Sequence, residues 1–395
     1  MRRAGKIHFD EIDCKTVWTP ESVTWKRHID QPKTVSATID LLKKDAAYQL
    51  ASGTAQWWMD LTQQGWFDAP EAVEPLRRLA AIDERLRASS YAAAECAFGE
   101  VALVVSQRSM MFQAPREGLA NATLKMFRNW HLSRLGAPFE QILVDDLGRA
   151  DLPKYKLYIM ANLFYASAAD CQAIERVVKR AGSTVLWIYA PGYLDDVSAS
   201  LENSRTLTGI QLGRADVTGD LDVEVTSFAH PLTSGLPAGF AYGTSIDYEQ
   251  YARPPKMQYL PNLSVNGAYY ADDPTATTLG MLAGVGRPGL VVKELPVSGG
   301  GTWRSVYSAA PLLTWPLLRN LARLAGVHLF ADEGDMVWAN SEFLAFYPLA
   351  TGRRTLRFPR PVAVEDAYSG ERLGEGIMSL DLVARRYEPR LLFYR

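Results

Sequence analysis

The first residues of the chain alternate between apolar and polar side chains and then become acidic. Ile7 and Phe9 are apolar, and Asp10, Glu11 and Asp13 follow before a stretch rich in turn residues. An alternation with a period of two is typical of a β-strand. We therefore expect a short strand at the start of the chain that ends in carboxylates.

Two helices and a second strand follow with equally clear patterns. Residues 32–50 carry apolar side chains at helical spacing, and residues 54–60 have the pattern of a strand. Pro70 begins a helix that runs to about Ala88, since proline is favoured in the first helical turn. Strand, helix, strand and helix form the unit that a (β/α)8 barrel repeats, so residues 1–95 are expected to be part of such a barrel.

A second series of alternating strands and helices begins near Glu100. The residues of the first strand, 101–105, are all apolar, as in a parallel strand buried on both faces. The further expected strands are 141–144, 156–160 and 184–189, and the expected helices are 120–135 and 167–180. Ser167 with Asp170 marks the start of the last of these helices. Such alternation predicts a doubly wound parallel sheet with a flavodoxin-like plan.

The last third of the chain has shorter elements. Short strands are expected near Val223 and at 278–282 and 290–293, with a turn at Arg287-Pro288-Gly289. A helix at 315–324 closes the domain, and short strands and turns after it predict a small β-sandwich. The chain is thus expected to be of the α/β class, with domains at 1–95, 96–326 and 327–395.

Composition narrows the possible partners. The chain has 42 lysines and arginines against 44 acidic residues, so its net charge of −2 offers no attraction to nucleic acid or to an anionic membrane. Cys14, Cys96 and Cys171 form no Cys-x-x-Cys pair, and His8 and His28 lack the spacing of metal ligands. No signal peptide or membrane-spanning run is found. We expect a cytoplasmic protein without metal or cofactor.

Three other patterns are weaker candidates. The glycine-rich residues 298–302 are interpreted as a hairpin turn rather than a phosphate cradle. The turn at 190–193 follows a parallel strand, where an amidotransferase holds its nucleophile, but it contains no cysteine or serine, so glutaminase activity is not expected. The aromatic run from Tyr242 to Tyr259, with Tyr248 and Tyr251, could line a sugar cleft, although packing is the preferred interpretation.

The candidate chemistry lies at the two strand ends of the expected barrel. Barrel enzymes place catalytic groups at the carboxyl ends of strands, which here directs attention to Asp10, Glu11, Asp13 and Asp60. Glycoside hydrolysis needs two carboxyl groups, about 5–5.5 Å apart when configuration is retained. The alternative is that these acids only cap turns and strand ends.

Several stretches together resemble large β-galactosidase-like proteins related to glycoside hydrolase family 42. These stretches are 9–16, 56–61, 65–68, 135–139, 152–158, 187–193, 230–233 and 325–328. The resemblance implies that Glu11 is the nucleophile at the end of the seventh barrel strand. It also implies a flavodoxin-like, amidotransferase-like trimerisation domain and a C-terminal β domain. The residues expected to bind the carbohydrate substrate or to orient the nucleophile are Trp57, Trp58, Trp66, Asp13 and Asp60.

The chain departs from this family in one respect. The family's acid/base glutamate follows an asparagine, and the sequence contains no Asn-Glu pair. The front of the barrel is therefore expected on another chain or lost by truncation. The expected function is that of a retaining β-galactosidase-like glycoside hydrolase, present as a partial chain and assembled as a homo-oligomer, with a trimer implied by the resemblance. The alternative is a non-catalytic assembly or carbohydrate-binding module.

Overall fold

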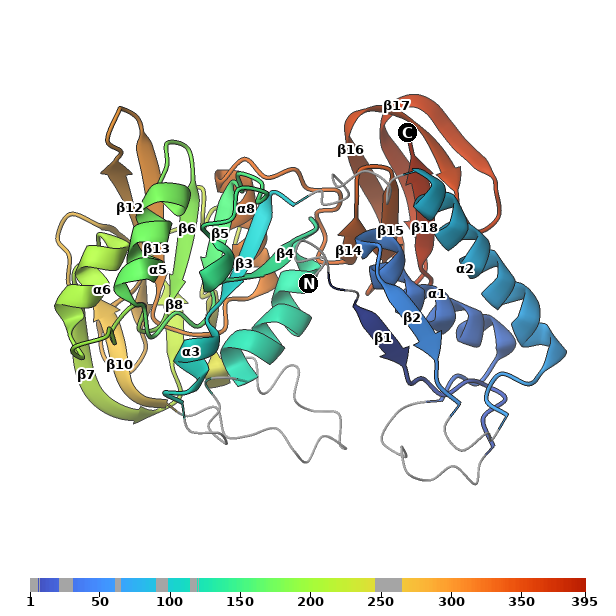
Figure 1. The fold of residues 1–395 in the computed structure, drawn as a ribbon. Helices are drawn as coiled ribbons and strands as arrows, with labels where there is room; N and C mark the ends of the chain where they lie inside the picture. Colours follow the sequence, from blue (N-terminus) through green and yellow to red (C-terminus); the bar gives the residue numbers. More distant parts are fainter. Residues whose placement is uncertain are drawn as a thin grey trace. The chain divides into compact units, whose positions relative to one another are not determined.

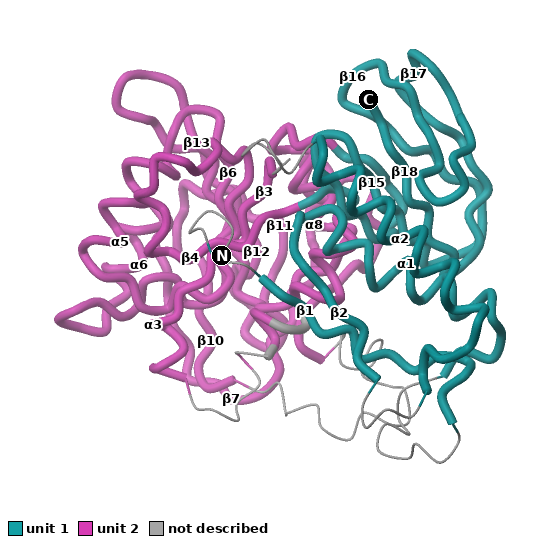
Figure 2. Tube along the Cα trace, turned by 45° about the vertical axis from the view of Figure 1, so that its right-hand side comes forward, with its two compact units in different colours: residues 1–98, 136–138, 329–395 teal, residues 99–135, 139–328 magenta. Residues whose placement is uncertain are grey.

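The computed structural model divides the chain into two compact units, coloured teal and magenta in Figure 2. The structure describes residues 6, 8–20, 31–60, 65–89, 99–113, 119, 121–245 and 265–395. Unit 1 consists of residues 1–98, 136–138 and 329–395, and unit 2 of residues 99–135 and 139–328. Each unit is described by itself.

Unit 1 begins with two parallel strands joined by a helix. Its first elements are β1 (Phe9–Ile12), α1 (Val35–Ser52), β2 (Ala55–Trp58) and α2 (Pro70–Ser89), which confirms the four elements predicted from the sequence. The Thr34 side chain accepts the amide of Ala37 and caps the start of α1, and Gly53 ends the helix at a φ of 65°. β1 and β2 pair in parallel, as a strand–helix–strand crossover requires.

The C-terminal strands of unit 1 form one antiparallel sheet. The strands are β14 (Met336–Ala339), β15 (Phe343–Tyr347), β16 (Gly352–Asp366), β17 (Arg372–Ala384) and β18 (Arg390–Tyr394), in the order β14-β15-β18-β16-β17. The sequence predicts a small sandwich here, whereas all five strands pair into a single sheet. β16 and β17 form one long hairpin in place of the separate short strands that were expected. The hairpin continues past an irregularity in its register between Arg357 and Val362.

Both faces of this sheet are covered by apolar side chains. On one face, Phe343 and Phe393 pack with Leu42 of α1 and with Leu79 and Leu86 of α2. On the other face, the alternate strand residues pack among themselves; they include Leu344, Phe346, Leu392 and Tyr394. In Figure 1, α1 and α2 lie beside β14, β15 and β18. Unit 1 therefore joins the two helices near the N-terminus to the C-terminal sheet through one core.

Unit 2 is built on a nine-stranded mixed sheet (Figure 1). The strand order is β4-β3-β5-β6-β13-β12-β11-β8-β9. The parallel part contains β3 (Val101–Val105), β4 (Glu140–Leu143), β5 (Leu157–Met160), β6 (Thr184–Ile188) and β13 (Thr302–Ser308). The antiparallel part contains β8 (Asp222–Val225), β9 (Ala241–Gly243), β11 (Thr277–Leu282) and β12 (Arg287–Pro296). Every residue of β3, β5 and β6 is buried, as the apolar runs predict.

The helices of unit 2 are short. They are α3 (Gln107–Met110), η2 (Asn121–His131), η3 (Leu132–Arg134), η4 (Val144–Asp146), α5 (Ala168–Ala173), η5 (Ile174–Val178), α6 (Leu201–Thr208) and α8 (Trp315–Leu324). The helix predicted at 120–135 is present but is not an α-helix. Its first part, η2, is a π-helix, and its last turn, η3, is a 3-10 helix. Ser167 and Asp170 form a reciprocal capping box at the start of α5, as predicted.

Two features between β6 and α8 differ from the sequence prediction. β7 (Leu212–Gly219) and β10 (Val265–Ala271) form an antiparallel ribbon that the sequence does not predict. The expected turn at Arg287-Pro288-Gly289 lies inside β12, and the chain turns instead at 283–286. The hairpin predicted at 298–302 is confirmed, since Pro296 of β12 pairs with Thr302 of β13.

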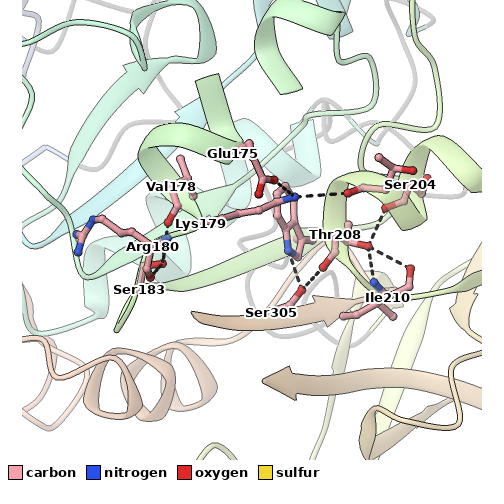
Figure 3. A network of polar contacts seen from close by, with 11 residues as sticks. Glu175, Val178, Lys179, Arg180, Ser183, Ser204, Thr208, Ile210 and Ser305 are labelled. Carbon is pink, nitrogen blue, oxygen red and sulfur yellow. Dashed lines mark hydrogen bonds and ion pairs between the residues drawn. The ribbon is translucent and has the colours of Figure 1, made fainter. Parts of the chain in front are cut away.

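A chain of polar contacts holds α6 against the sheet of unit 2 (Figure 3). The indole nitrogen of Trp187 donates to Oγ of Ser305 at 3.0 Å, and this hydroxyl donates to the carbonyl of Thr208 at 2.7 Å. The Thr208 hydroxyl in turn donates to the carbonyl of Ser204 at 2.8 Å. All four residues are buried, so these hydrogen bonds hold the end of α6 to the sheet and pair the indole nitrogen and the two hydroxyl groups that take part.

Three expectations from the sequence remain to be compared with the structure. Among the described helices, none combines the length and apolar character required to cross a membrane. The expectations for Tyr248, Tyr251, His28 and Cys96 fall outside the described residues. Tyr242, at the start of the predicted aromatic run, lies in β9 and is fully buried.

Candidate active site on strands β1 and β2

The pairing of β1 with β2 places Glu11 directly beside Trp57. The register joins Phe9 to Ala55, Glu11 to Trp57 and Ile12 to Trp58. The amide of Ala55 donates to the carbonyl of His8, and the amide of Met59 donates to that of Ile12, both at 3.0 Å. Because side chains of paired residues point to the same face, Glu11 and Trp57 share one face of the ribbon.

This face is open, whereas the opposite face is packed. Phe9 is 60% exposed and Trp57 is 41% exposed, and Glu11 between them is exposed as well. On the opposite face, Ile12 is buried in the core that contains α1, and Trp58 packs against this core and against Phe67. The ribbon thus has one face that holds it to its own helices and one face that carries a carboxylate between two aromatic rings.

The side chain of Asp10 lies on the packed face of the ribbon, toward α1. The side-chain amide of Gln49, on α1, donates to Oδ2 of Asp10 at 2.5 Å. Gln49 is buried, so this charge-assisted hydrogen bond links β1 to the helix in a place with little water. Asp10 therefore lies on the face opposite Glu11 and does not form a carboxylate pair with it.

Asp60 and Trp66 organise the loop that follows β2. Oδ2 of Asp60 accepts the amides of Gly65 at 2.8 Å and of Trp66 at 3.1 Å. The Trp66 side chain is fully buried, and its carbonyl accepts the hydroxyl of Thr16 from the loop after β1. A fully buried indole offers no face to a sugar in this arrangement. Trp66 instead joins the two loops at the carboxyl ends of β1 and β2.

The loop after β1 is held by further buried polar groups. The side-chain amide of Gln31 donates to the carbonyls of Thr16 at 2.7 Å and of Thr19 at 2.8 Å. Cys14 is buried beside Asp45, and burial first, with the charge of Asp45 second, raises the pKa of its thiol. A neutral thiol of this kind is structural rather than nucleophilic.

The structure brings together only some of the residues predicted for the site. Glu11 and Trp57 meet on the open face, Asp13 is half-buried directly after β1, and Trp58 and Trp66 lie in or against the core. Sequence reasoning missed Thr16 and Gln49, because their partners are 50 and 39 residues away and no local pattern marks them. Among the described residues, no group of acidic, histidine and cysteine side chains could hold a metal ion.

The turn after β6, which was compared with the nucleophile turn of amidotransferases but contains no cysteine or serine, has an unusual backbone. Tyr189 has a φ of 66°, a value that bulky residues rarely adopt. Its hydroxyl donates to the carbonyl of Gly267 at 2.9 Å, and its ring packs edge-on against Phe164 and Tyr269. A strained turn is therefore present, and its side chain is occupied in packing.

Comparisons with known proteins found similarity in solved structures. No family model matches the chain, and no curated protein matches it. The β-galactosidase of Bacillus circulans sp. alkalophilus matches with a TM-score of 0.59 at 13% identity, over 91% of this chain and 52% of its own. The fold resembles that of part of a family 42 β-galactosidase.

Two further β-galactosidase structures agree with this finding. The cold-adapted enzyme of Rahnella sp. R3 has a TM-score of 0.59 at 15% identity, with coverage of 94% of this chain and 53% of that one. A catalytic mutant of Gan42B, a family 42 β-galactosidase from G. stearothermophilus, has a TM-score of 0.58 at 14% identity, with coverage of 94% and 52%. The chain thus spans about half the length of the β-galactosidases that it resembles. At these identities the similarity concerns the family 42 fold.

Proposed function

We propose that this chain is part of a retaining β-galactosidase-like glycoside hydrolase in which Glu11 is the nucleophile. The observation that carries the proposal is the position of Glu11 beside Trp57 on the open face of a parallel strand pair. In a (β/α)8 barrel, helices cover the outer face of the strands, and substrate is bound at their carboxyl ends. In the described part of unit 1, the helices α1 and α2 pack on the opposite face, through Ile12 and Trp58, so the face that carries Glu11 would correspond to the interior of a barrel.

The proposed chemistry follows from this position. The Glu11 carboxylate attacks the anomeric carbon and forms a glycosyl ester, while a second carboxyl group protonates the departing oxygen. The same second group then activates the water that hydrolyses the ester. The exposed ring of Trp57 offers an apolar surface to the sugar face next to the reacting carbon. Asp60 holds the loop after β2 in place, because its carboxylate accepts the amides of Gly65 and Trp66.

The proposal places the second carboxyl group on strands other than β1 and β2. Asp10 points to the packed face and Asp60 binds loop amides, so neither stands opposite Glu11. The sequence also lacks the Asn-Glu pair of the family. The remaining strands would belong to a longer form of this protein or to a second polypeptide, and the modules 1–95, 96–326 and 327–395 are the proposed parts of the family architecture in this chain.

A trapping experiment tests the role of Glu11. A 2-deoxy-2-fluoro-β-galactosyl fluoride forms a slowly hydrolysed glycosyl ester, and peptide mass mapping of the treated protein is expected to find the label on Glu11. Where aryl β-galactosides are hydrolysed, Glu11→Gln should reduce kcat on the order of 10³-fold or more, since it removes the nucleophile. Asp10→Asn is the matched control, because it changes the neighbouring carboxylate on the packed face. A label on another carboxylate would remove Glu11 from the proposed role.

The second candidate is a non-catalytic assembly or carbohydrate-binding module. It is favoured by the fact that, in the described part of β1 and β2, the open face carries one carboxylate instead of two. A folded chain that binds galactosides but neither hydrolyses them nor takes up the fluorosugar label would support this candidate. Assembly into a trimer belongs to both candidates and is measured by light scattering of the purified chain.

A further inference from the structure

Unit 2 carries a distinct feature where β3 and β5 end. The chain leaves β3 for β4 on one side and then crosses to β5 on the other side, and ligands of α/β sheets bind outside the strand ends at such a point. Here the ends of β3 and β5 are joined to each other by two hydrogen bonds. The amide of Ser106 donates to Oδ1 of Asn162 at 2.9 Å, and Nδ2 of Asn162 donates to the carbonyl of Ser106 at 3.0 Å.

Two stacked aromatic rings, Phe112 and Tyr165, lie in the segments that follow β3 and β5. The rings of Phe112 and Tyr165 are 5.2 Å apart between centroids and inclined by only 18°. The backbone of Tyr165 is fixed by Ser109, because its amide donates to Oγ of Ser109 at 3.0 Å and its carbonyl accepts the same hydroxyl at 3.2 Å. Phe112 is 58% exposed. One face of Phe112 therefore rests on a fixed ring, and the other face is available to a ligand.

Polar groups surround the edge of this stack. The hydroxyl of Tyr165 donates to Oδ1 of Asp196 at 2.5 Å, and Oδ2 of Asp196 accepts the amide of Ala168 at 3.4 Å. Asp196 and Arg108 are both exposed, and a hydrogen bond to Tyr165 raises the pKa of Arg108. A carboxylate has about four acceptor positions and a guanidinium five donors, so both groups keep capacity for a ligand.

This combination matches the two sides of a sugar ring. A pyranose has an apolar face of C–H groups and an edge of hydroxyl groups, which suits a flat ring bordered by a hydrogen-bond donor and an acceptor. A purely apolar partner would desolvate Arg108 and Asp196 without replacing their hydrogen bonds, which is costly. We propose that Phe112, stacked on Tyr165 and flanked by Arg108 and Asp196, binds one pyranose ring of a neutral carbohydrate. This site is separate from Glu11 and does not depend on the proposed hydrolysis.

The test uses the whole chain with a Trp57→Ala substitution, so that the open face of β1 and β2 contributes little to sugar binding. Saturation-transfer NMR with methyl β-D-galactopyranoside and methyl β-D-glucopyranoside should show transfer to the C–H face of at least one of them. Phe112→Ala should weaken this binding by about tenfold, and Asp196→Asn by about twofold to tenfold. Phe112→Trp, which keeps a flat ring, should retain it.

Two controls decide between a stacking platform and general apolar contact. Phe112→Leu keeps an apolar side chain but removes the flat ring, so it should weaken binding as Phe112→Ala does. Met111→Ser changes the exposed neighbouring side chain and should leave binding unchanged. The proposal is overturned if neither sugar shows transfer, or if both Phe112→Ala and Phe112→Leu bind as the parent does. Circular dichroism spectra of all variants must be the same, which is expected for substitutions at exposed positions.

Discussion

His230 in unit 2 is a single residue whose environment makes stability depend on pH. It lies half-buried between β8 and β9, and its Nδ1 accepts the amide of Leu232 at 3.1 Å. Burial first, and the charge of Arg304 second, lower the pKa of His230, while Glu294 acts in the opposite direction. A ring nitrogen that accepts a hydrogen bond must be unprotonated, so the folded state favours neutral His230.

The sign of the pH effect follows from this lowered pKa. The pKa of histidine in an unfolded chain is about 6.5, and the folded chain binds fewer protons at that pH, so this contribution to stability is complete above it. It is lost progressively as the pH falls from about 6.5 through the folded pKa of His230. We expect the thermal midpoint of unit 2 to fall on acidification, and His230→Asn, which keeps an acceptor for Leu232, to flatten this dependence. Equal pH profiles for both proteins would contradict the assignment.

At the scale of an element, residues 136–138 show how closely two segments of unit 1 approach one another. Gly136 has a φ of 84°, and its carbonyl accepts the amide of Phe330 at 2.7 Å. A Cβ atom placed on Gly136 would lie 1.8 Å from the carbonyl oxygen of Ala331. The segment therefore approaches the chain at 330–331 so closely that only glycine fits.

We expect Gly136→Ala to lower the free energy of unfolding of unit 1 by about 2–5 kcal/mol, from left-handed strain together with overpacking. Gly370→Ala is the matched control in the same unit. Gly370 has a φ of 78° but nothing within 4 Å of its added Cβ, so strain alone should cost about 1–2 kcal/mol. Urea unfolding followed by circular dichroism measures both variants. If the two variants had equal effects, the contact with Ala331 would not contribute.

The sequence predicts elements well where the pattern is local. The capping box of α5 and the apolar runs of β3 and β6 need only neighbouring residues, and the structure confirms them. The β7–β10 ribbon was missed because its strands are far apart in the sequence: β7 ends at Gly219 and β10 begins 46 residues later, at Val265. In addition, neither strand alternates regularly. The π-helical form of η2 also escaped, since helical periodicity does not separate the helix types.

The candidate site was predictable as a set of residues but not as a geometry. The acidic strand end indicated Asp10, Glu11 and Asp13 together, and the resemblance to family 42 proteins singled out Glu11, Trp57 and Trp58. Which of the two tryptophans shares a face with Glu11 depends on the register of β1 with β2, and a shift by one residue would exchange them. Trp66 illustrates a further limit, because the sequence cannot distinguish a sugar-binding ring from one fully buried beneath a loop.

At the scale of the whole molecule, the two units have separate cores and buried polar groups of their own. In unit 1, Nε of Arg354 lies 2.5 Å from Oδ2 of Asp335, and the two side chains are only 9% and 1% exposed. The amide of Leu349 donates to the other oxygen of Asp335 at 2.8 Å. Removal of Arg354 would leave Asp335 buried without its counter-charge, which is strongly destabilising.

We expect calorimetry to resolve two unfolding transitions, of which Arg354→Met lowers only one, by about 3–5 kcal/mol in free energy. Arg357→Met is the control, because its partner Asp332 is 2.8 Å away but Arg357 is 49% exposed, and such pairs contribute about 0–1 kcal/mol. The His230→Asn substitution should affect the other transition. A single transition that shifts as a whole in every variant would show that the units unfold together.

The open face of β1 and β2 also has an optical consequence. Trp57, at 41% exposed, is the most exposed tryptophan in the described part of the chain, while Trp66 and Trp187 are fully buried. Iodide should therefore quench the red edge of the indole emission and leave the blue edge bright. Anything that covers the face beside Glu11, whether a sugar or further strands, would shield the same ring. The chain thus carries its own fluorescent reporter for the surface on which its proposed function depends.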